Sequence, residues 1–124
     1  RPHLVQPTFL TNHPLDISPR AKKHDKNPEE VRRFQLVVAG MELANGFAEL
    51  NDPLEQRKRF DVQEKMRGEG ELEAHPIDED YLETMEYGMP PAAGLGIGVD
   101  RLVMLFTDTK NIREVILFPT MRSK

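Results

Sequence analysis

Apolar residues recur at two different periods along the chain, and together these periods predict an α+β fold. Short apolar runs bounded by proline and glycine are typical of β-strands, which we expect near residues 8–12, 34–39, 42–50, 94–99 and 115–118. Apolar residues spaced three and four apart predict helices near 53–67 and 78–88. We therefore expect an antiparallel sheet with flanking helices and no parallel βαβ crossovers.

Acidic residues and glycines mark where these helices begin and end. Asp52 and Asp78 have the pattern of helix N-caps, and Gly68 is expected to end the first helix. That helix has few apolar positions, so it is expected to lie on the surface. Asp100 is expected to cap a short apolar helix that follows it. Residues 18–27 show no apolar period, which predicts a mobile basic loop.

Residues 34–50 predict a β-hairpin with a tight turn at Ala39-Gly40. A two-residue loop pairs Val37 with Glu42. It places Gln35 diagonal to Glu42, at about 7 Å. The sequence therefore predicts that Gln35 and Glu42 are neighbours on one face of the sheet.

The returning strand of this hairpin carries a second set of candidate residues. Asn45, Phe47 and Glu49 share one face by the period of two. Strict alternation would place Glu42 on the opposite face. Either these residues serve different surfaces, or a bulge lies between Glu42 and Asn45.

Composition narrows the class of protein. The 124 residues are enough for one small domain and scarcely for two, and with 17 basic and 21 acidic residues the net charge is −4. This charge argues against a module that reads DNA through a basic face. No apolar run approaches the roughly 18 residues of a membrane span, and no signal peptide is recognisable. The lack of cysteine excludes disulfides and thiolate chemistry and suits a cytoplasmic protein. Without an initiator methionine, the chain resembles a piece of something longer.

Alternating glycines and one arginine form the first candidate site. Gly94, Gly96 and Gly98 remove side chains from one strand face, which indicates either close sheet packing or room for a ligand. Arg101 follows just inside a helix N-terminus, where the helix dipole disfavours a cation. Its position is explained either by a salt bridge to an acid or by an anion such as a phosphate that binds there.

Two acids in a strand of small and apolar residues form the second candidate site. Glu42 and Glu49 are either solvated residues or, with Asn45 and Phe47, a set made of carboxylates, an amide and an aromatic wall. The histidines are scattered without metal-ligand spacing, so we interpret His3, His13, His24 and His75 as structural or surface residues.

These motifs resemble a known family. Residues 94–101, Gly-Leu-Gly-Ile-Gly-Val-Asp-Arg, are similar to motif 3 of class II aminoacyl-tRNA synthetases. Residues 41–53 resemble the amino-acid-binding strand of the lysyl-tRNA synthetases, and residues 6–14, 86–91 and 116–119 fit the same family. The resemblance covers nearly the whole chain. It implies the carboxy-terminal segment of a class II catalytic domain.

The resemblance also implies roles for particular residues. Arg101 would hold the adenine face and terminal phosphate of ATP as a catalytic residue, and Glu42 would ligate magnesium at the triphosphate. Asn45 would lie at the nucleotide or at the lysine carboxylate. Phe47 would pack on the lysine methylenes and Glu49 would pair with the ε-ammonium group. Gly96 and Gly98 would leave room for lysine. The implied reaction forms lysyl-adenylate from lysine and ATP and then transfers lysine to tRNA(Lys).

Two departures from the family pattern matter. The family usually has a second magnesium-ligating glutamate where this chain has Gln35, and a neutral amide is expected to bind the metal more weakly. The chain also lacks motif 1, motif 2 and the anticodon-binding domain. We therefore expect the isolated segment to be inactive, its sheet edge to be unpaired and prone to self-association, and the parent enzyme to be a cytoplasmic homodimer that does not bind membranes.

Two alternatives to a tRNA ligase remain open. A related synthetase could attach lysine or a lysine derivative to a protein such as an elongation factor; Gly96 and residues 116–122 favour the tRNA ligase over it. The other alternative is a non-catalytic, synthetase-like binding module. An upstream motif 2 in the gene would argue against that module.

Overall fold

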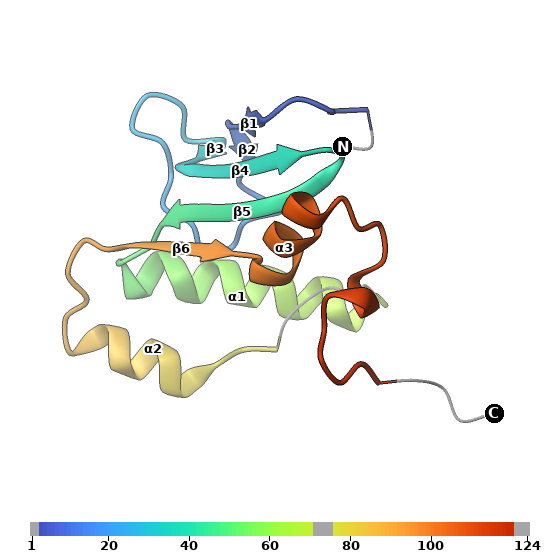
Figure 1. The fold of residues 1–124 in the computed structure, drawn as a ribbon. Coiled ribbons are helices and arrows are strands. Elements are labelled where there is room, and N and C mark those ends of the chain that lie inside the picture. The colour runs from blue at the N-terminus through green and yellow to red at the C-terminus, as the bar shows by residue number, and fades with distance from the viewer. Residues whose placement is uncertain (1–2, 71–75, 121–124) are drawn as a thin grey trace. The chain divides into compact units, whose positions relative to one another are not determined.

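The computed structural model describes residues 3–70 and 76–120 (Figure 1). Before residue 50 the described elements are strands, and after it they are helices apart from one strand and one 3₁₀ turn. In chain order the elements are β1 (Thr8–Leu10), β2 (His13–Pro14), β3 (Glu30–Val31), β4 (Arg33–Val38), β5 (Met41–Ala48), α1 (Pro53–Gly68), α2 (Glu79–Glu86), β6 (Ala93–Ile97), α3 (Val99–Thr107) and the 3₁₀ turn η1 (Ile112–Glu114).

The described strands form antiparallel sheets, which confirms the predicted fold class. The larger sheet has the order β1-β4-β5-β6, and β2 pairs with β3 in a small separate ladder. Within the described residues, β1 and β6 are therefore the edges of the larger sheet. An exposed edge offers backbone groups to another strand, so self-association through these edges stays a prediction.

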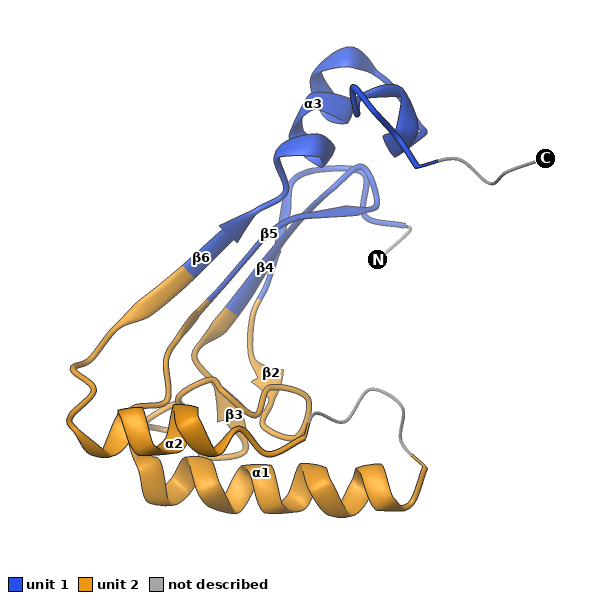
Figure 2. Cartoon of the chain, turned by 90° about the horizontal axis from the view of Figure 1, so that it is seen from below, with its two compact units in different colours: residues 1–10, 34–46, 95–124 blue, residues 11–33, 47–94 orange. Residues whose placement is uncertain are grey.

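The chain divides into two compact units, a division that the sequence did not indicate. Unit 1 comprises residues 1–10, 34–46 and 95–124, and unit 2 comprises residues 11–33 and 47–94 (Figure 2). The boundary falls inside β4, β5 and β6, so each of these strands contributes residues to both units. The expectation of one small domain, which rests on length, stays a prediction, because the two units share these strands.

The β4–β5 hairpin turns at Ala39-Gly40, as the sequence predicts. Both turn residues have positive φ, 49° at Ala39 and 76° at Gly40. Positive φ at both central positions is the geometry of the two-residue turn whose twist matches that of the strands. This turn places Met41 directly opposite Val38, with the backbone of Met41 directed toward β4.

Farther along β5, a different set of residues faces β4. The N–H of Ala48 donates to the carbonyl of Arg32 at 2.9 Å. On the other edge of β5, the Leu43 carbonyl accepts from Gly98 and the Glu49 N–H donates to Ala92. Because backbone groups of alternate residues point to opposite strand edges, odd-numbered Met41 and even-numbered Ala48 cannot both face β4 in a regular strand.

One extra residue in β5 accounts for this change of register. Leu43 and Ala44 are consecutive and both buried, which departs from the alternation of a regular strand. A bulge at these two residues, opposite Leu36, shifts the pairing by one residue. Past the bulge, Asn45 lies opposite Gln35. This is the bulge that the sequence required if Glu42 and Asn45 share a face.

Helix α1 in unit 2 begins as predicted and ends at Gly68. The Asp52 side chain accepts hydrogen bonds from the N–H groups of Leu54 and Glu55. The prediction of a surface helix was wrong in one respect, because Phe60 is only 1% exposed and packs near Tyr81 of α2. The two helices thus share an aromatic contact within unit 2.

Polar residues carry the rest of the buried face of α1. Gln56 and Arg59 are buried, and both bind backbone carbonyls of the segment before β3. Gln56 Nε2 donates to Pro19 at 3.1 Å, and Arg59 Nη1 donates to Ala21 at 2.7 Å. A search for apolar periodicity overlooks this face because two of its members are polar.

The same contacts correct the prediction of a mobile basic loop over residues 18–27. Ala21 is buried and pairs with Glu49 in an isolated bridge, and Lys22 N–H donates to Ala48. Lys23 forms an ion pair with Glu55 at 2.7 Å. Lys22 Nζ donates to Asn51 Oδ1 at 3.0 Å, so the side chains of Lys22 and Lys23 both have specific partners in unit 2.

Helix α3 in unit 1 begins earlier than predicted. Its N-cap is Gly98, which makes no side-chain cap hydrogen bond, and Asp100 lies in the first turn. The expectation that Asp100 caps the helix was wrong, because the chain already turns helical at Val99. Because α3 begins at Val99, strand β6 ends at Ile97, two residues before the end that the sequence predicted.

The strand expected at 115–118 does not form. Leu117 and Phe118 are 90% and 91% exposed, and the part of the chain that the structure describes supplies no strand paired with them. A strand depends on a neighbour to satisfy its backbone N–H and C=O groups. The apolar composition of this segment was therefore not enough to predict a buried strand.

The positive φ at Ala39 predicts that asparagine stabilises the hairpin. Left-handed backbone costs most L-residues about 1–2 kcal/mol and costs asparagine less. Ala39→Asn should raise the free energy of hairpin opening by about 0.5–1 kcal/mol. Amide hydrogen exchange of residues 33–48 in the protein should then slow about two- to fivefold. The same change at exposed Ala92, where φ is not positive, should not slow exchange in the hairpin. Equal or faster exchange in Ala39→Asn would contradict this.

The ion pairs of Glu55 predict a pH-dependent contribution to stability. The hydrogen bond from Lys23, with a further one from Arg59, holds the pKa of Glu55 below its usual 4.5. Because the folded-state pKa is the lower one, this stabilisation is present above about pH 4.5 and is lost as pH falls through the folded-state value. Glu55→Gln should lower the urea midpoint at pH 7 and match the unchanged protein in acid. Glu64→Gln, at a surface pair 3.9 Å from Arg67, should change little.

Candidate functional site

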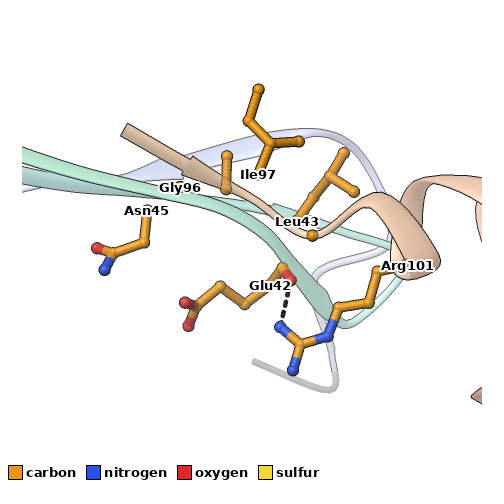
Figure 3. A pocket seen from close by; sticks show the side chains of 8 residues that line it. Glu42, Leu43, Asn45, Gly96, Ile97 and Arg101 are labelled. Atoms are coloured by element: carbon orange, nitrogen blue, oxygen red, sulfur yellow. Dashed lines mark hydrogen bonds between the residues drawn. The ribbon is translucent and has the colours of Figure 1, made fainter. Parts of the chain in front are cut away.

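Unit 1 contains a cavity of about 300 Å³ between the start of β5 and the end of β6. Most of the site residues that the sequence predicts in this unit lie around it (Figure 3). The lining residues are Glu42, Leu43, Ala44, Asn45, Gly96, Ile97, Gly98 and Arg101.

The bulge in β5 decides which side chains meet on one side of the strand. Glu42 and Asn45 point to the same side in Figure 3, and Leu43 points to the other. Asn45 lies three positions after Glu42, so regular alternation would have placed the two side chains on opposite faces. The extra residue therefore brings a carboxylate and an amide together.

Two hydrogen bonds fix the polar groups near Glu42. Arg101 Nη1 donates to the Glu42 backbone carbonyl at 2.7 Å, and Gln35 Nε2 donates to Glu42 Oε2 at 2.9 Å. The diagonal contact between Gln35 and Glu42 that the hairpin predicted is therefore present. Gln35 itself is 3% exposed and does not line the cavity.

Arg101 projects from the first turn of α3. Within residues 3–70 and 76–120, no acidic side chain lies within ion-pair distance of its guanidinium, so the salt bridge considered as an alternative is not observed there. The bond to a neutral carbonyl orients the guanidinium and leaves its charge uncompensated by these residues. An uncapped helix N-terminus and an arginine are together a favourable place for an anion.

Of the two glycines in β6, Gly96 leaves space beside β5. The bonds Gly98 N–H to Leu43 O and Glu49 N–H to Ala92 O have the same register, which places Gly96 opposite Asn45 and Gly94 opposite Phe47. A Cβ at Gly96 would find only the Asn45 carbonyl, at 3.8 Å. The face that carries Asn45 is thus open along Gly96.

Unit 2 holds the other predicted site residues, Phe47 and Glu49. Both are partly buried. The Glu49 carboxylate lies close to Gly94, because a Cβ at Gly94 would be 3.1 Å from Glu49 Oε1. Any side chain at Gly94 would press on this carboxylate. Gly94 therefore has a local steric reason to be glycine.

Tyr81 and Arg20 are neighbours in unit 2, and no sequence motif marks either of them as a site residue. Burial raises the pKa of Tyr81 above its usual value, and the Glu49 carboxylate raises it further, while Arg20 opposes these effects. The Arg20 guanidinium lies 5.4 Å from the centre of the Tyr81 ring and 5.9 Å from that of Phe60. Only the helical spacing of Tyr81 was visible in the sequence, and it indicated packing alone.

The donor atoms near the cavity are hard oxygens. Magnesium prefers such donors and commonly uses one or two carboxylates together with substrate phosphates. The Glu42 carboxylate and the nearby amide of Gln35 fit this preference. Among the described residues, no three histidine, cysteine or acidic side chains form a complete metal-binding group. His75 lies outside the described residues, and the other histidines show no metal-ligand grouping there.

Comparison with known proteins identifies the family of this chain. A family model described as class II tRNA synthetases (D, K and N) matches residues 1–122. The chain therefore belongs to the class II tRNA synthetases of this group. Within the part of the chain that the structure describes, no helix is both long enough and apolar enough to cross a membrane.

Comparison with individual proteins gives matches that carry a more specific name than the family model does. The chain is 58% identical over 123 residues to a protein named lysine–tRNA ligase from Moorella thermoacetica, covering 99% of this chain and 25% of that relative. It is 59% identical over 121 residues to the lysine–tRNA ligase of Oceanobacillus iheyensis, covering 98% of this chain and 24% of that relative. The chain thus spans about a quarter of the length of these relatives.

The close approach at Gly94 predicts the effect of adding a methyl group there. Gly94→Ala should push the Glu49 carboxylate away by a few tenths of an ångström, because 3.1 Å is too close for an ordinary contact. Gly96→Ala should leave Asn45 in place, since its nearest neighbour is at 3.8 Å. Crystal structures of both variants at high resolution would measure the two shifts. An unmoved Glu49 in Gly94→Ala would show that Gly94 does not set its position.

Proposed function

We propose that this chain is the carboxy-terminal segment of the catalytic domain of a lysine–tRNA ligase. Motif 1, motif 2 and the anticodon-binding domain would lie elsewhere in the same protein. The observation that carries the proposal is the cavity in unit 1, where the bulge of β5 brings Glu42 and Asn45 together beside Arg101. The identity of 56–59% to proteins named lysine–tRNA ligase supports it.

The nucleotide part of the proposed site is formed by Arg101, Glu42 and Asn45. Arg101 is held toward the cavity by its bond to the Glu42 carbonyl, and the α3 N-terminus lies beside it. A guanidinium in this position binds phosphate and stacks against a planar base. Arg101 would therefore neutralise charge on the triphosphate of ATP and steady the adenine ring.

Glu42 and Gln35 are the proposed metal residues. Glu42 supplies a carboxylate and Gln35 an amide, so the pair carries one negative charge. Bound magnesium would screen the triphosphate and polarise its phosphorus. Glu42 would hold the ion at the nucleotide, with phosphate oxygens completing its coordination.

The family resemblance assigns lysine binding to Asn45, Phe47 and Glu49, together with Gly96 and Gly98. A Cβ at Gly96 would have open space beside Asn45, whereas a Cβ at Gly98 would lie 3.4 Å from the Arg101 side chain. Phe47 would cover the lysine methylenes and Glu49 would pair with the ε-ammonium group. A desolvated ion pair at that end separates lysine from uncharged amino acids of similar length.

The proposed reaction has two steps. A lysine carboxylate oxygen attacks the α-phosphorus of ATP, the bond to the bridging oxygen breaks, and pyrophosphate leaves. A terminal ribose hydroxyl of tRNA(Lys) then attacks the lysyl carbonyl carbon, loses its proton, and releases AMP. The residues of this chain bind and orient the substrates and neutralise charge, which is the main contribution of a protein to such transfers. The resemblance supports a homodimeric, cytoplasmic parent enzyme.

Two substitutions should separate the two parts of the site in the full-length enzyme. Glu49→Gln should weaken lysine binding by about 2–5 kcal/mol, because a buried ammonium would lose its charge partner. Arg101→Ala should raise the KM for ATP and lower the rate of adenylation while leaving the KM for lysine nearly unchanged. Lysine-dependent ATP–pyrophosphate exchange measures both effects.

Matched controls test whether these effects are local. Glu83→Gln and Arg113→Ala remove the same charges from exposed positions and should leave exchange unchanged. If Glu49→Gln kept its lysine affinity, the lysine assignment would fail. If the full-length protein exchanged label with no dependence on lysine, the proposed function itself would fail. The 124 residues alone should give no lysine-dependent exchange.

A further inference from the structure

Gln35 lies behind the proposed nucleotide site. It belongs to β4, a central strand of the sheet, and is almost completely buried. Glu42 lines the cavity and Gln35 does not. The two residues therefore differ in their access to a bound ion, although they are in direct contact.

The direction of the hydrogen bond shows what Gln35 does for Glu42. Its Nε2 donates to Glu42 Oε2 at 2.9 Å. The opposite orientation of the amide would set two acceptor oxygens, Gln35 Oε1 and Glu42 Oε2, against each other at this distance. The amide oxygen is directed away from Glu42 Oε2, because oxygen and nitrogen diverge from the same carbon.

We propose that Gln35 is a positioning residue, which acts on the metal through Glu42 and is not itself a ligand. Its hydrogen bond holds the Glu42 carboxylate so that the other oxygen, Oε1, is presented to a divalent cation. The inference rests on the proposed function, since it concerns the same metal site. It changes the role of Gln35 from neutral ligand to hydrogen-bond donor.

A second glutamate at this position would behave differently. Two carboxylates 2.9 Å apart need a proton or a cation between them, because like charges at this distance cannot both remain ionised without one. Gln35 and Glu42 need neither. The single carboxylate of this pair is thus held by a hydrogen bond before any metal binds, and the pair provides one charged ligand.

Substitution of Gln35 in the full-length protein tests this role in solution. Gln35→Met has a similar length and cannot donate a hydrogen bond. It should weaken Mn²⁺ binding, measured by electron paramagnetic resonance with a non-hydrolysable ATP analogue, by about tenfold or more, as for other residues that orient metal ligands. The KM for ATP should rise while the KM for lysine stays within about twofold, a split that general loss of structure would not produce. Gln63→Met on α1 should change neither constant.

A glutamate variant gives an independent readout. Gln35→Glu should melt at a lower temperature than the unchanged protein without metal, and Mn²⁺ with the analogue should restore more stability to it than to the unchanged protein. Equal melting temperatures of the two metal-free proteins would contradict a role for the donated hydrogen bond.

A crystal structure of the unchanged full-length protein with Mn²⁺ and the analogue needs no variant to fold. We expect the ion, located by its anomalous signal, on Glu42, with Gln35 Oε1 beyond about 3.5 Å and the bond to Glu42 retained. Gln35 Oε1 at about 2.0–2.2 Å from the ion would overturn the inference and leave the proposed function intact. An ion away from Glu42 would overturn both the metal assignment and the inference. Absence of lysine-dependent exchange would count against the proposed function alone.

Discussion

The extra residue in β5 is the constraint on which the candidate site depends. The turn at Ala39-Gly40 directs Met41 toward β4, and the bond from Ala48 to Arg32 directs an even-numbered residue to the same edge. The two observations are compatible only if the strand changes register between them. The change turns Glu42 and Asn45 to one side of the strand, and it frees the Leu43 carbonyl to accept from Gly98 at the start of α3. The bulge therefore also positions the start of α3, from which the Arg101 side chain reaches the Glu42 carbonyl.

Charge is organised around this strand in two different ways. In unit 1, the Arg101 guanidinium binds a neutral carbonyl, and the Glu42 carboxylate accepts from a neutral amide, so neither of these two contacts neutralises a charge. Among the described residues, the Arg101 guanidinium thus keeps its charge for an anion. In unit 2, by contrast, Lys23, Arg59 and Glu55 compensate one another, as structural ion pairs do.

Local signals in the sequence were sufficient for the elements whose stability is local. The N-caps at Asp52 and Asp78 and the turn at Ala39-Gly40 depend on neighbouring residues and were predicted correctly. Residues 115–118 could not be predicted, because a strand depends on a partner that an apolar pattern does not reveal. The buried face of α1 was missed because Gln56 and Arg59 are satisfied by carbonyls some 40 residues earlier. Arg20 lies near Phe60 and Tyr81, and Tyr81 lies near enough to Glu49 to be affected by its charge. These neighbours were missed because contacts between segments distant in the sequence leave no local signal. The bulge was predicted only as a condition, since alternation showed that it was needed without showing where it lies.

Interstrand proton contacts in the hairpin test the bulge most directly. In an antiparallel pair, the α-protons of residues opposite each other approach closely only at pairs that are not hydrogen-bonded. With selective labelling of the full-length protein, the bulged register predicts nuclear Overhauser effects between the α-protons of Asn45 and Gln35 and between those of Phe47 and Arg33. A regular hairpin would instead give contacts between Ala44 and Gln35 and between Gly46 and Arg33. The first pattern is the one that this account predicts, and the second would contradict it.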